Sequence, residues 1–205
     1  MAKIKVISGG MRAGKSEDIY RRYKRAKMAG MKVQVFKPDL DRRFSEDEVV
    51  SRDNNKVKCI AVPAENAEYI LSVLEEDVKL VIIDEAQFFK PRLTATVNEG
   101  TYIGGAAKNL QNISDKTCVV TEYYPIVDVV QELFDRGIDI VIEGLDMDSE
   151  RKPFGAMPAL MAIATECKKI HAICEVCHNS VMYSYAGFDK KEQVALGETE
   201  YTALC

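Results

Sequence analysis

The residues best suited to chemistry lie near the start of the chain, in a glycine-rich segment that ends in a lysine and a serine. Residues 9–16 read GGMRAGKS, which fits the pattern GxxxxGK(S/T), and they stand between an apolar run and a helical pattern. Successive backbone N–H groups of such a loop, with the positive end of a helix dipole, can surround phosphate oxygens. We therefore expect Lys15 to reach the β- and γ-phosphates of a nucleotide and the Ser16 hydroxyl to bind magnesium.

Two acids follow a short apolar run farther along the chain. Residues 79–83 are typical of a buried parallel strand, and Asp84 and Glu85 come directly after them. In nucleotide-dependent enzymes an acid here holds magnesium through water, and a neighbouring carboxylate can orient or deprotonate the attacking group. An acid pair at a strand end is otherwise a solvated cap. The P-loop fold favours the magnesium interpretation, because we expect it to carry both motifs on adjacent strand ends.

Three cysteines near the end of the sequence have the spacing of zinc ligands. Cys174 and Cys177 form a CxxC pair, and Cys205 ends the sequence. They match three of the four ligands of a zinc ribbon. Either His171 or His178 could supply the fourth ligand, and without one the site would be weak or empty.

The whole composition limits the partners of these residues. The chain has 205 residues, a net charge of −4 and a pI near 5.4. This balance favours neither nucleic acid nor an anionic membrane as partner, and we see no apolar run of membrane-spanning length and no secretory segment. The basic run of Arg21, Arg22, Lys24, Arg25 and Lys27 would suit nucleic acid or a solvated helix face, and the acidic net charge favours the solvated face. We expect a cytoplasmic protein whose cysteines are thiols or metal ligands.

Strands alternate with helices along the sequence, which indicates an α/β fold with a parallel sheet. Residues 37–55 are expected to be loop, and residues 90–124 show so little periodicity that we expect a long inserted loop. That insertion could be a lid, an oligomer contact or a solvated excursion without a role. The predicted strands are residues 4–7, 32–36, 56–62, 79–83, 138–142 and 167–173. Helices are expected after Ser16 with a cap at Gly30, over residues 64–74, at Ile126 to Leu133 and over residues 156–165.

Four stretches together resemble the type II thymidine kinases, a family with a RecA-like core and a zinc-bearing lasso module. They are IDEAQFF at 83–89, VFKPDLDRRFS at 35–45, GLDMD with RKPFG within 144–155, and AICEVC at 172–177. The resemblance covers almost the whole chain except residues 90–124. It implies a RecA-like P-loop sheet flanked by helices over residues 1–168 and a small zinc-ribbon-like lasso module over residues 169–205.

The resemblance also implies an activity, which is transfer of the γ-phosphate of ATP to the 5′-hydroxyl of thymidine or deoxyuridine in nucleotide salvage for DNA synthesis. Glu85 matches the family's general base, and Lys15 and Arg43 would neutralise charge on the transferring group. Ser16 would bind Mg²⁺ while Asp41 and Asp84 order its waters. The residues expected to contact ATP are Gly9, Gly10, Met11, Arg12, Ala13, Gly14, Lys15, Ser16, Asp84 and Gln87.

A nucleoside pocket is implied by a further set of positions. Phe88, Leu145 and Tyr201 match residues that line the base pocket, although each aromatic could instead be plain core packing. The residues expected to contact the nucleoside are Met11, Phe88, Leu145, Ser149, Ser184, Val194, Ala195, Leu196, Gly197 and Tyr201. The family further implies structural Zn²⁺ at Cys174, Cys177 and Cys205, a homotetramer, and feedback inhibition by dTTP.

Several residues depart from the family pattern. Gly10, Arg12 and Ala13 stand where Pro, Phe and Ser are usual, Arg52 where His is usual, and Ser149 where a Phe is usual. Loss of the ring at Ser149 would open the pocket, so a kinase of a 5-modified deoxypyrimidine nucleoside is one alternative. A regulatory P-loop protein without catalysis and a zinc-ribbon nucleic-acid binder are others. The acidic net charge disfavours the nucleic-acid binder, and retention of Glu85 disfavours the regulatory protein.

Overall fold

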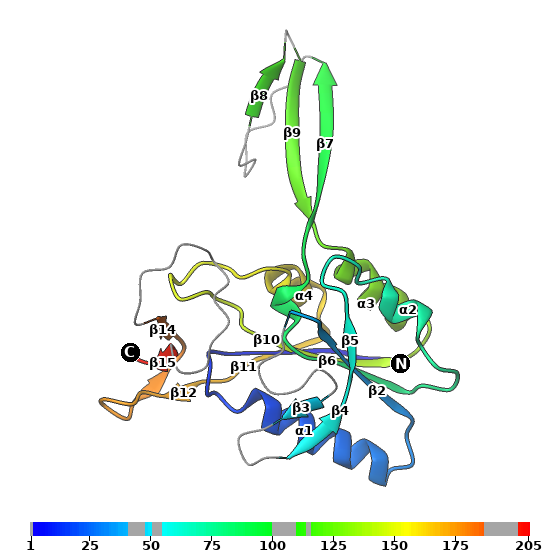
Figure 1. The fold of residues 1–205 in the computed structure, drawn as a ribbon, viewed down its shortest axis with the longest axis vertical. Helices are drawn as coiled ribbons and strands as arrows, with labels where there is room; N and C mark the ends of the chain where they lie inside the picture. The colour runs from blue at the N-terminus through cyan, green and yellow to red at the C-terminus, as the bar shows by residue number, and fades with distance from the viewer. Residues whose placement is uncertain (1, 41–47, 51–54, 100–109, 114–115, 187–200) are drawn as a thin grey trace.

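A six-stranded parallel sheet forms the centre of the protein (Figure 1), in the strand order β11-β1-β10-β6-β2-β5. The computed structural model describes residues 2–40, 48–50, 55–99, 110–113, 116–186 and 201–205. This architecture confirms the predicted α/β fold. The strands of the sheet are β1 (Ile4–Ser8), β2 (Val33–Pro38), β5 (Ile60–Val62), β6 (Leu80–Ile83), β10 (Asp139–Gly144) and β11 (Glu166–Lys169).

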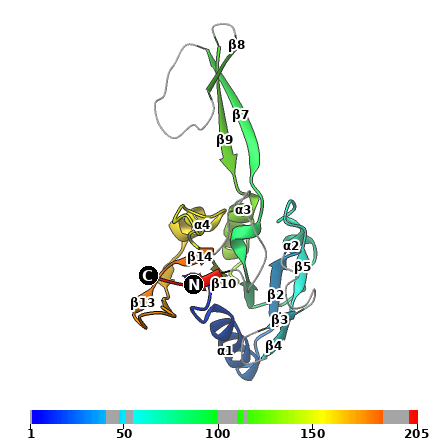
Figure 2. The same ribbon diagram turned by 60° about the vertical axis from the view of Figure 1, so that its left-hand side comes forward.

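Helices cover both faces of this sheet, as the two views show (Figures 1 and 2). Side chains alternate along β1, so Val6 packs on one face and Ile7 on the other, where it meets Ile19 of the covering helix. Within the described residues no helix is both long and apolar enough to cross a membrane. The helices are α1 (Lys15–Met28) on one face, and α2 (Tyr69–Ser72), α3 (Pro125–Asp135) and α4 (Met157–Ile163) on the other.

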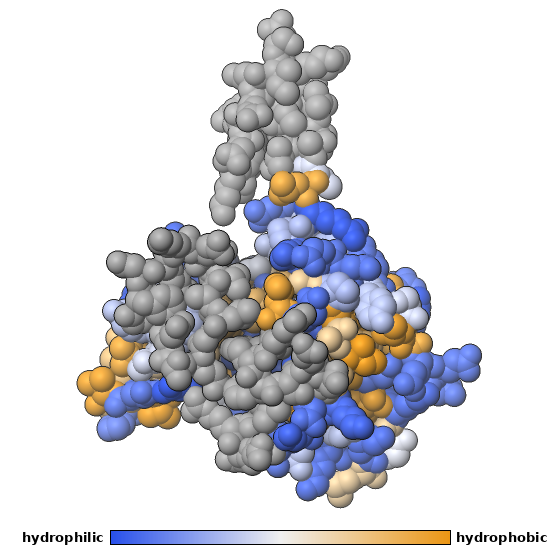
Figure 3. All heavy atoms as spheres, in the orientation of Figure 1, coloured by the Kyte–Doolittle hydropathy of each residue, from blue (hydrophilic) through white to orange (hydrophobic). Residues whose placement is uncertain are grey.

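The described residues between 90 and 124 differ from the prediction of a structureless loop, because they form a three-stranded antiparallel arm. Strand β7 (Arg92–Glu99) pairs with β9 (Lys116–Tyr123), which pairs with β8 (Leu110–Ile113). The arm projects away from the core in both views. Leu93, near the start of β7, is 70% exposed. Figure 3 shows a small apolar surface at the base of the arm. The prediction failed because these strands are rich in Thr and polar residues and pair with each other instead of joining the central sheet.

Two further predicted elements are divided in the structure. The predicted strand 56–62 is two strands, since β4 (Lys56–Lys58) leaves the central sheet to pair with β3 (Glu48–Val50), within the predicted loop. Of the predicted helix 64–74, only the four residues of α2 are α-helical.

The C-terminal part of the chain forms a small unit of short antiparallel strands. The predicted strand 167–173 is divided, because β11 ends in the central sheet before β12 (Ala172–Ile173) starts a hairpin with β13 (Ser180–Val181). Strand β14 (Ser184–Ala186) pairs with β15 (Tyr201–Ala203). Buried side chains of this unit form one small apolar cluster, which lies beside the end of β1.

Candidate active site

The glycine-rich loop joins β1 to α1, as the motif predicted. Gly14 caps the helix with φ 88°, a backbone conformation that glycine adopts without strain. Lys15 is the first residue of α1, and its ammonium donates hydrogen bonds to the carbonyl oxygens of Gly9 and Gly10, each at 3.1 Å. The lysine therefore turns back over the loop and concentrates positive charge beside the backbone N–H groups, which is the arrangement that phosphate oxygens require.

The two acids lie at the same edge of the sheet as this loop. Strand β10 pairs with β1 on one side and with β6 on the other, so the strand ends are separated by one strand and are not adjacent as predicted. Asp84 is buried, its backbone N–H donates to Phe36 O at 2.9 Å, and its Oδ1 accepts the N–H of Glu85 at 2.9 Å. The acid that would face magnesium is thus held in position by the backbone.

Glu85 has a strained backbone and a buried partner. Its φ of 50° lies in the left-handed region, which is costly for a residue with a Cβ. The Gln87 amide donates to Glu85 Oε2 at 2.5 Å, and its Oε1 accepts the N–H of Leu145 at 3.0 Å. Gln87 was expected to contact ATP, and here it joins the candidate base to the loop that follows β10.

Gln87 packs closely against two glycines. Its side chain lies against Gly144, and its backbone lies against Gly155. A Cβ on Gly144 would lie 2.5 Å from Gln87 Oε1, and one on Gly155 would lie 2.0 Å from the Gln87 carbonyl oxygen. Gly155 requires glycine, because the added Cβ would meet backbone and its φ of 52° is positive, whereas at Gly144 the side chains of Gln87 and Met157 would have to shift.

The expected nucleoside contacts occupy several loops near this edge. Phe88 is buried and meets Phe154 edge-on, with ring centroids 5.8 Å apart. Tyr201 is also buried, while Leu145 and Ser149 are half-buried. Sequence reasoning named Phe88 as a nucleoside contact but gave Phe154 no role of its own, although it lies in the RKPFG stretch that resembles the family. The expected residues Asp41, Arg43, Val194, Ala195, Leu196 and Gly197, with Arg52, lie outside the described residues.

Ser184 and Arg12 both take part in contacts of the loop apex with the C-terminal unit. The Ser184 hydroxyl accepts the backbone N–H of Met11 at 2.8 Å. Arg12 has φ 65° and forms an ion pair with Glu175, which stands between two of the cysteines. The Arg12 side chain therefore turns to the cysteine-bearing hairpin.

Glu143 is a buried acid that the sequence reasoning missed. It is fully buried near the end of β10, and its carboxylate oxygens have no hydrogen-bond partner in the described part of the chain. Burial, with the negative charge of Asp84 next, raises the pKa of Glu143 well above its ordinary value, against the opposing effect of Lys15. The signal was available, because Glu143 follows an apolar run in the same way as Asp84.

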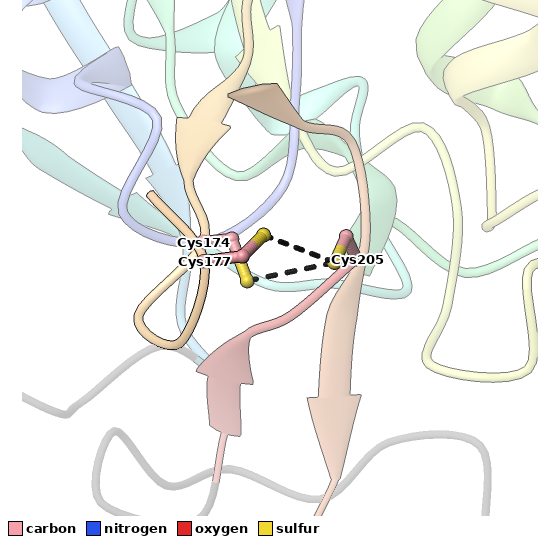
Figure 4. Close-up of side chains that lie close together, drawn as sticks. All are labelled: Cys174, Cys177 and Cys205. Carbon is pink, nitrogen blue, oxygen red and sulfur yellow. Dashed lines mark hydrogen bonds between the residues drawn. The ribbon is translucent and has the colours of Figure 1, made fainter. Parts of the chain in front are cut away.

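Three thiols gather at the end of the chain, as Figure 4 shows. The Sγ atom of Cys205 lies 3.7 Å from that of Cys174 and 3.4 Å from that of Cys177, and all three lie within 4.8 Å of one another. Tetrahedral zinc with bonds of about 2.3 Å sets its sulfur ligands about 3.8 Å apart, so this cluster fits the metal. Among the described residues the cluster holds no histidine, and His171 Nδ1 instead lies 2.8 Å from Ser180 Oγ.

The backbone around this cluster favours a thiolate. N–H groups of Cys177 and Val176 lower the pKa of Cys174 to about 6, whereas hydrogen bonds with the other two thiols raise the pKa of Cys205 to about 11. A thiolate at Cys174 within 4.8 Å of two further thiols is a starting point for metal binding, since zinc binds thiolates.

Comparison with known proteins identifies one family along nearly the whole chain. The family described as thymidine kinase matches residues 2–103 and 106–205, so the match runs through most of residues 90–124, which were expected to be an insertion. A thymidine kinase of Porphyromonas gingivalis is 40% identical over 203 residues, 98% of this chain and 82% of the relative. One of Bacteroides fragilis is 38% identical over 204 residues, covering 99% and 84%, and one of Mycoplasma mobile is 36% identical over 203 residues, covering 98% and 84%. The chain therefore belongs to the thymidine kinase family.

Proposed function

We propose that this protein is a thymidine kinase, which transfers the γ-phosphate of ATP to the 5′-hydroxyl of thymidine in nucleotide salvage. The observation that carries this proposal is the meeting of the Lys15 loop with Asp84 and Glu85 at one edge of the sheet, in a chain whose family match is nearly complete. Loop and acids together are the two halves that phosphoryl transfer needs, a phosphate cradle and a carboxylate near the acceptor.

In this reaction Glu85 is the general base. It accepts the proton of the 5′-hydroxyl as that oxygen attacks the γ-phosphorus, and Gln87 holds its carboxylate in the direction of the acceptor. Lys15 releases its loop carbonyls and pairs with the phosphates as they enter. Magnesium, when bound, neutralises charge on the β- and γ-phosphates, and Ser16 and Asp84 would hold it together with Asp41. Arg43 neutralises charge on the transferring group.

Phe88, Tyr201 and Leu145 line the thymine ring in this proposal, and the backbone of residues 194–197 reads its edge. Zinc at the three cysteines stabilises the unit formed by residues 169–205, which is the substrate module next to a kinase core of residues 1–168. We extend the proposal to a homotetramer, to inhibition by dTTP, which would occupy both halves of the site, and to a cytoplasmic location.

The half-buried Ser149 favours a second substrate class, because the missing ring leaves room beside the base. The test compares kcat/KM for thymidine, deoxyuridine and 5-hydroxymethyldeoxyuridine, with purified protein, ATP and magnesium. We expect thymidine to be phosphorylated efficiently, and the Ser149→Phe variant to lose activity on the larger nucleoside first. A clear preference of the wild type for the 5-hydroxymethyl nucleoside would assign the alternative, and no phosphorylation of any deoxynucleoside would refute the kinase.

A further inference from the structure

The apex of the glycine-rich loop packs directly against the unit that carries the cysteines. A Cβ on Gly9 would lie 2.3 Å from the carbonyl oxygen of Ile170, so the two backbones touch. Met11 donates its N–H to Ser184 Oγ at 2.8 Å. Ala13 packs against a small apolar core made of Ala172, Cys174, Val181 and Ala203. The shape of the phosphate loop is therefore set partly by residues more than 150 positions away in the chain.

One further contact between the loop and this unit is ionic. Arg12 pairs with Glu175, and the two side chains are 28% and 42% exposed. Glu175 lies inside the CxxC turn, where its own N–H donates to Ala203 O at 3.0 Å, two residues before Cys205. The carboxylate that holds Arg12 is therefore fixed by the same backbone that brings the three thiols together.

Arg12 needs such an anchor because its φ of 65° is unfavourable for a residue with a side chain. A left-handed residue persists where surrounding contacts over-determine it. With the pair broken, the loop around Arg12 would relax, and its N–H groups would lose the alignment that phosphate binding needs.

We propose that Glu175 is a positioning residue for the ATP site, acting through Arg12, and that metal capture by Cys174, Cys177 and Cys205 tightens ATP binding through this ion pair. The inference rests on the proposed use of the loop for ATP. It makes the cysteine unit a regulator of the donor site in addition to a support for the acceptor site.

A double-mutant cycle on the zinc-loaded protein tests the pair. We measure Kd for a non-hydrolysable ATP analogue with magnesium in the wild type, Glu175→Gln, Arg12→Met and the double variant. A partly exposed ion pair corresponds to a change of about three- to fivefold, so each single variant should weaken binding by roughly that factor. The double variant should be no weaker than the singles. Glu132→Gln is the matched control, because it removes the exposed pair with Arg136 at 2.9 Å on α3.

The four Kd values show whether Glu175 acts on ATP binding through Arg12 or in another way. If Glu175→Gln weakens binding equally in the Arg12→Met background, Glu175 does not act through Arg12. If Glu175→Gln tightens binding, Arg12 contacts phosphates directly and the pair competes with ATP. Either result overturns the proposal. The KM for ATP should rise in both single variants while the KM for thymidine stays unchanged.

A second measurement tests the metal. Chelation of zinc should raise Kd for the analogue in the wild type and leave it unchanged in Glu175→Gln, with circular dichroism to verify that the fold is retained. Equal Kd values for wild-type protein with and without zinc, or a protein that takes up no zinc, would contradict the inference and leave the kinase proposal intact. A protein that binds no ATP analogue in any form would instead refute the proposed function.

Discussion

The buried amide of Gln87 holds the carboxylate of Glu85, through a hydrogen bond of 2.5 Å from Nε2 to Oε2. Only 2% of Gln87 is exposed, and its Oε1 is used by the N–H of Leu145. Because both Nε2 and Oε1 of Gln87 form hydrogen bonds, its amide group has one orientation. The Glu85 carboxylate that it binds is therefore held in one orientation as well. This relationship makes Gln87 the residue that aims the proposed general base.

Gln87→Leu should lower kcat by roughly 10- to 100-fold, because a base displaced by about 1 Å loses its reach to the hydroxyl proton. The Kd for ATP should change little. Gln34→Leu is the matched control, since Gln34 is also buried, donates to Val73 O at 3.1 Å and accepts from Glu75 N at 2.8 Å, away from the site. Steady-state kinetics on folded protein check this. Equal loss of kcat in both variants would show that stability, and not the aim of Glu85, is involved.

Gly155→Ala should destabilise the protein more than Gly137→Ala. Both glycines have positive φ, of 52° and 78°, so both variants carry backbone strain. Only at Gly155 does the new Cβ meet backbone, at 2.0 Å from Gln87 O, whereas Gly137 has open space. The clash adds about 1–3 kcal/mol, and each kcal/mol corresponds to about 2–4 °C in Tm. Thermal unfolding of both variants measures the difference, and equal Tm values would disprove close packing at Gly155.

Glu143→Gln should stabilise the protein at neutral and higher pH. The folded pKa of Glu143 is raised above the ordinary value of 4.5, so the folded state holds a proton that the unfolded state has released. The contribution of Glu143 to the stability of the wild type is therefore fully present below pH 4.5, the ordinary pKa, and is lost as pH rises through the folded pKa. The neutral variant lacks this loss, so its Tm should exceed that of the wild type at pH about 8 and approach it at pH about 4. A wild type that gains on the variant as pH rises would show an ionised, well-partnered carboxylate.

Zinc should raise Tm through the three thiols. Zinc at about 100 times its Kd would stabilise the folded state by about 2.7 kcal/mol. Cys177→Ser should lose this shift and the bound metal. Cys167→Ser should keep both, because Cys167 is an exposed thiol outside the cluster. Metal analysis with thermal unfolding provides the comparison, and an equal zinc content in the two variants would rule out the cluster as the site.

The sequence predicted the parts of the site that depend on local pattern. The loop at residues 9–16 and the strand before Asp84 follow from short motifs with strong backbone consequences. The contacts that join distant segments carried no such signal. Nothing in the spacing indicates that Glu175 meets Arg12 or that Gln87 meets Leu145, because tertiary packing alone brings them together.

The strands of the arm between residues 90 and 124 were also not predicted from the sequence. Its strands satisfy their hydrogen bonds by pairing with each other, so they do not need the apolar run that revealed β6. The Thr and Val residues of β7 and β9 were a weak signal beside the glycines of that segment.

The most direct measurement of the central claim is transfer of radiolabelled γ-phosphate from ATP to thymidine by the purified protein with magnesium. We predict thymidine 5′-monophosphate as the labelled product, and a rate for Glu85→Gln that is lower by roughly 100-fold or more. No labelled nucleotide from thymidine or any other deoxynucleoside, or an undiminished rate in Glu85→Gln, would contradict the account.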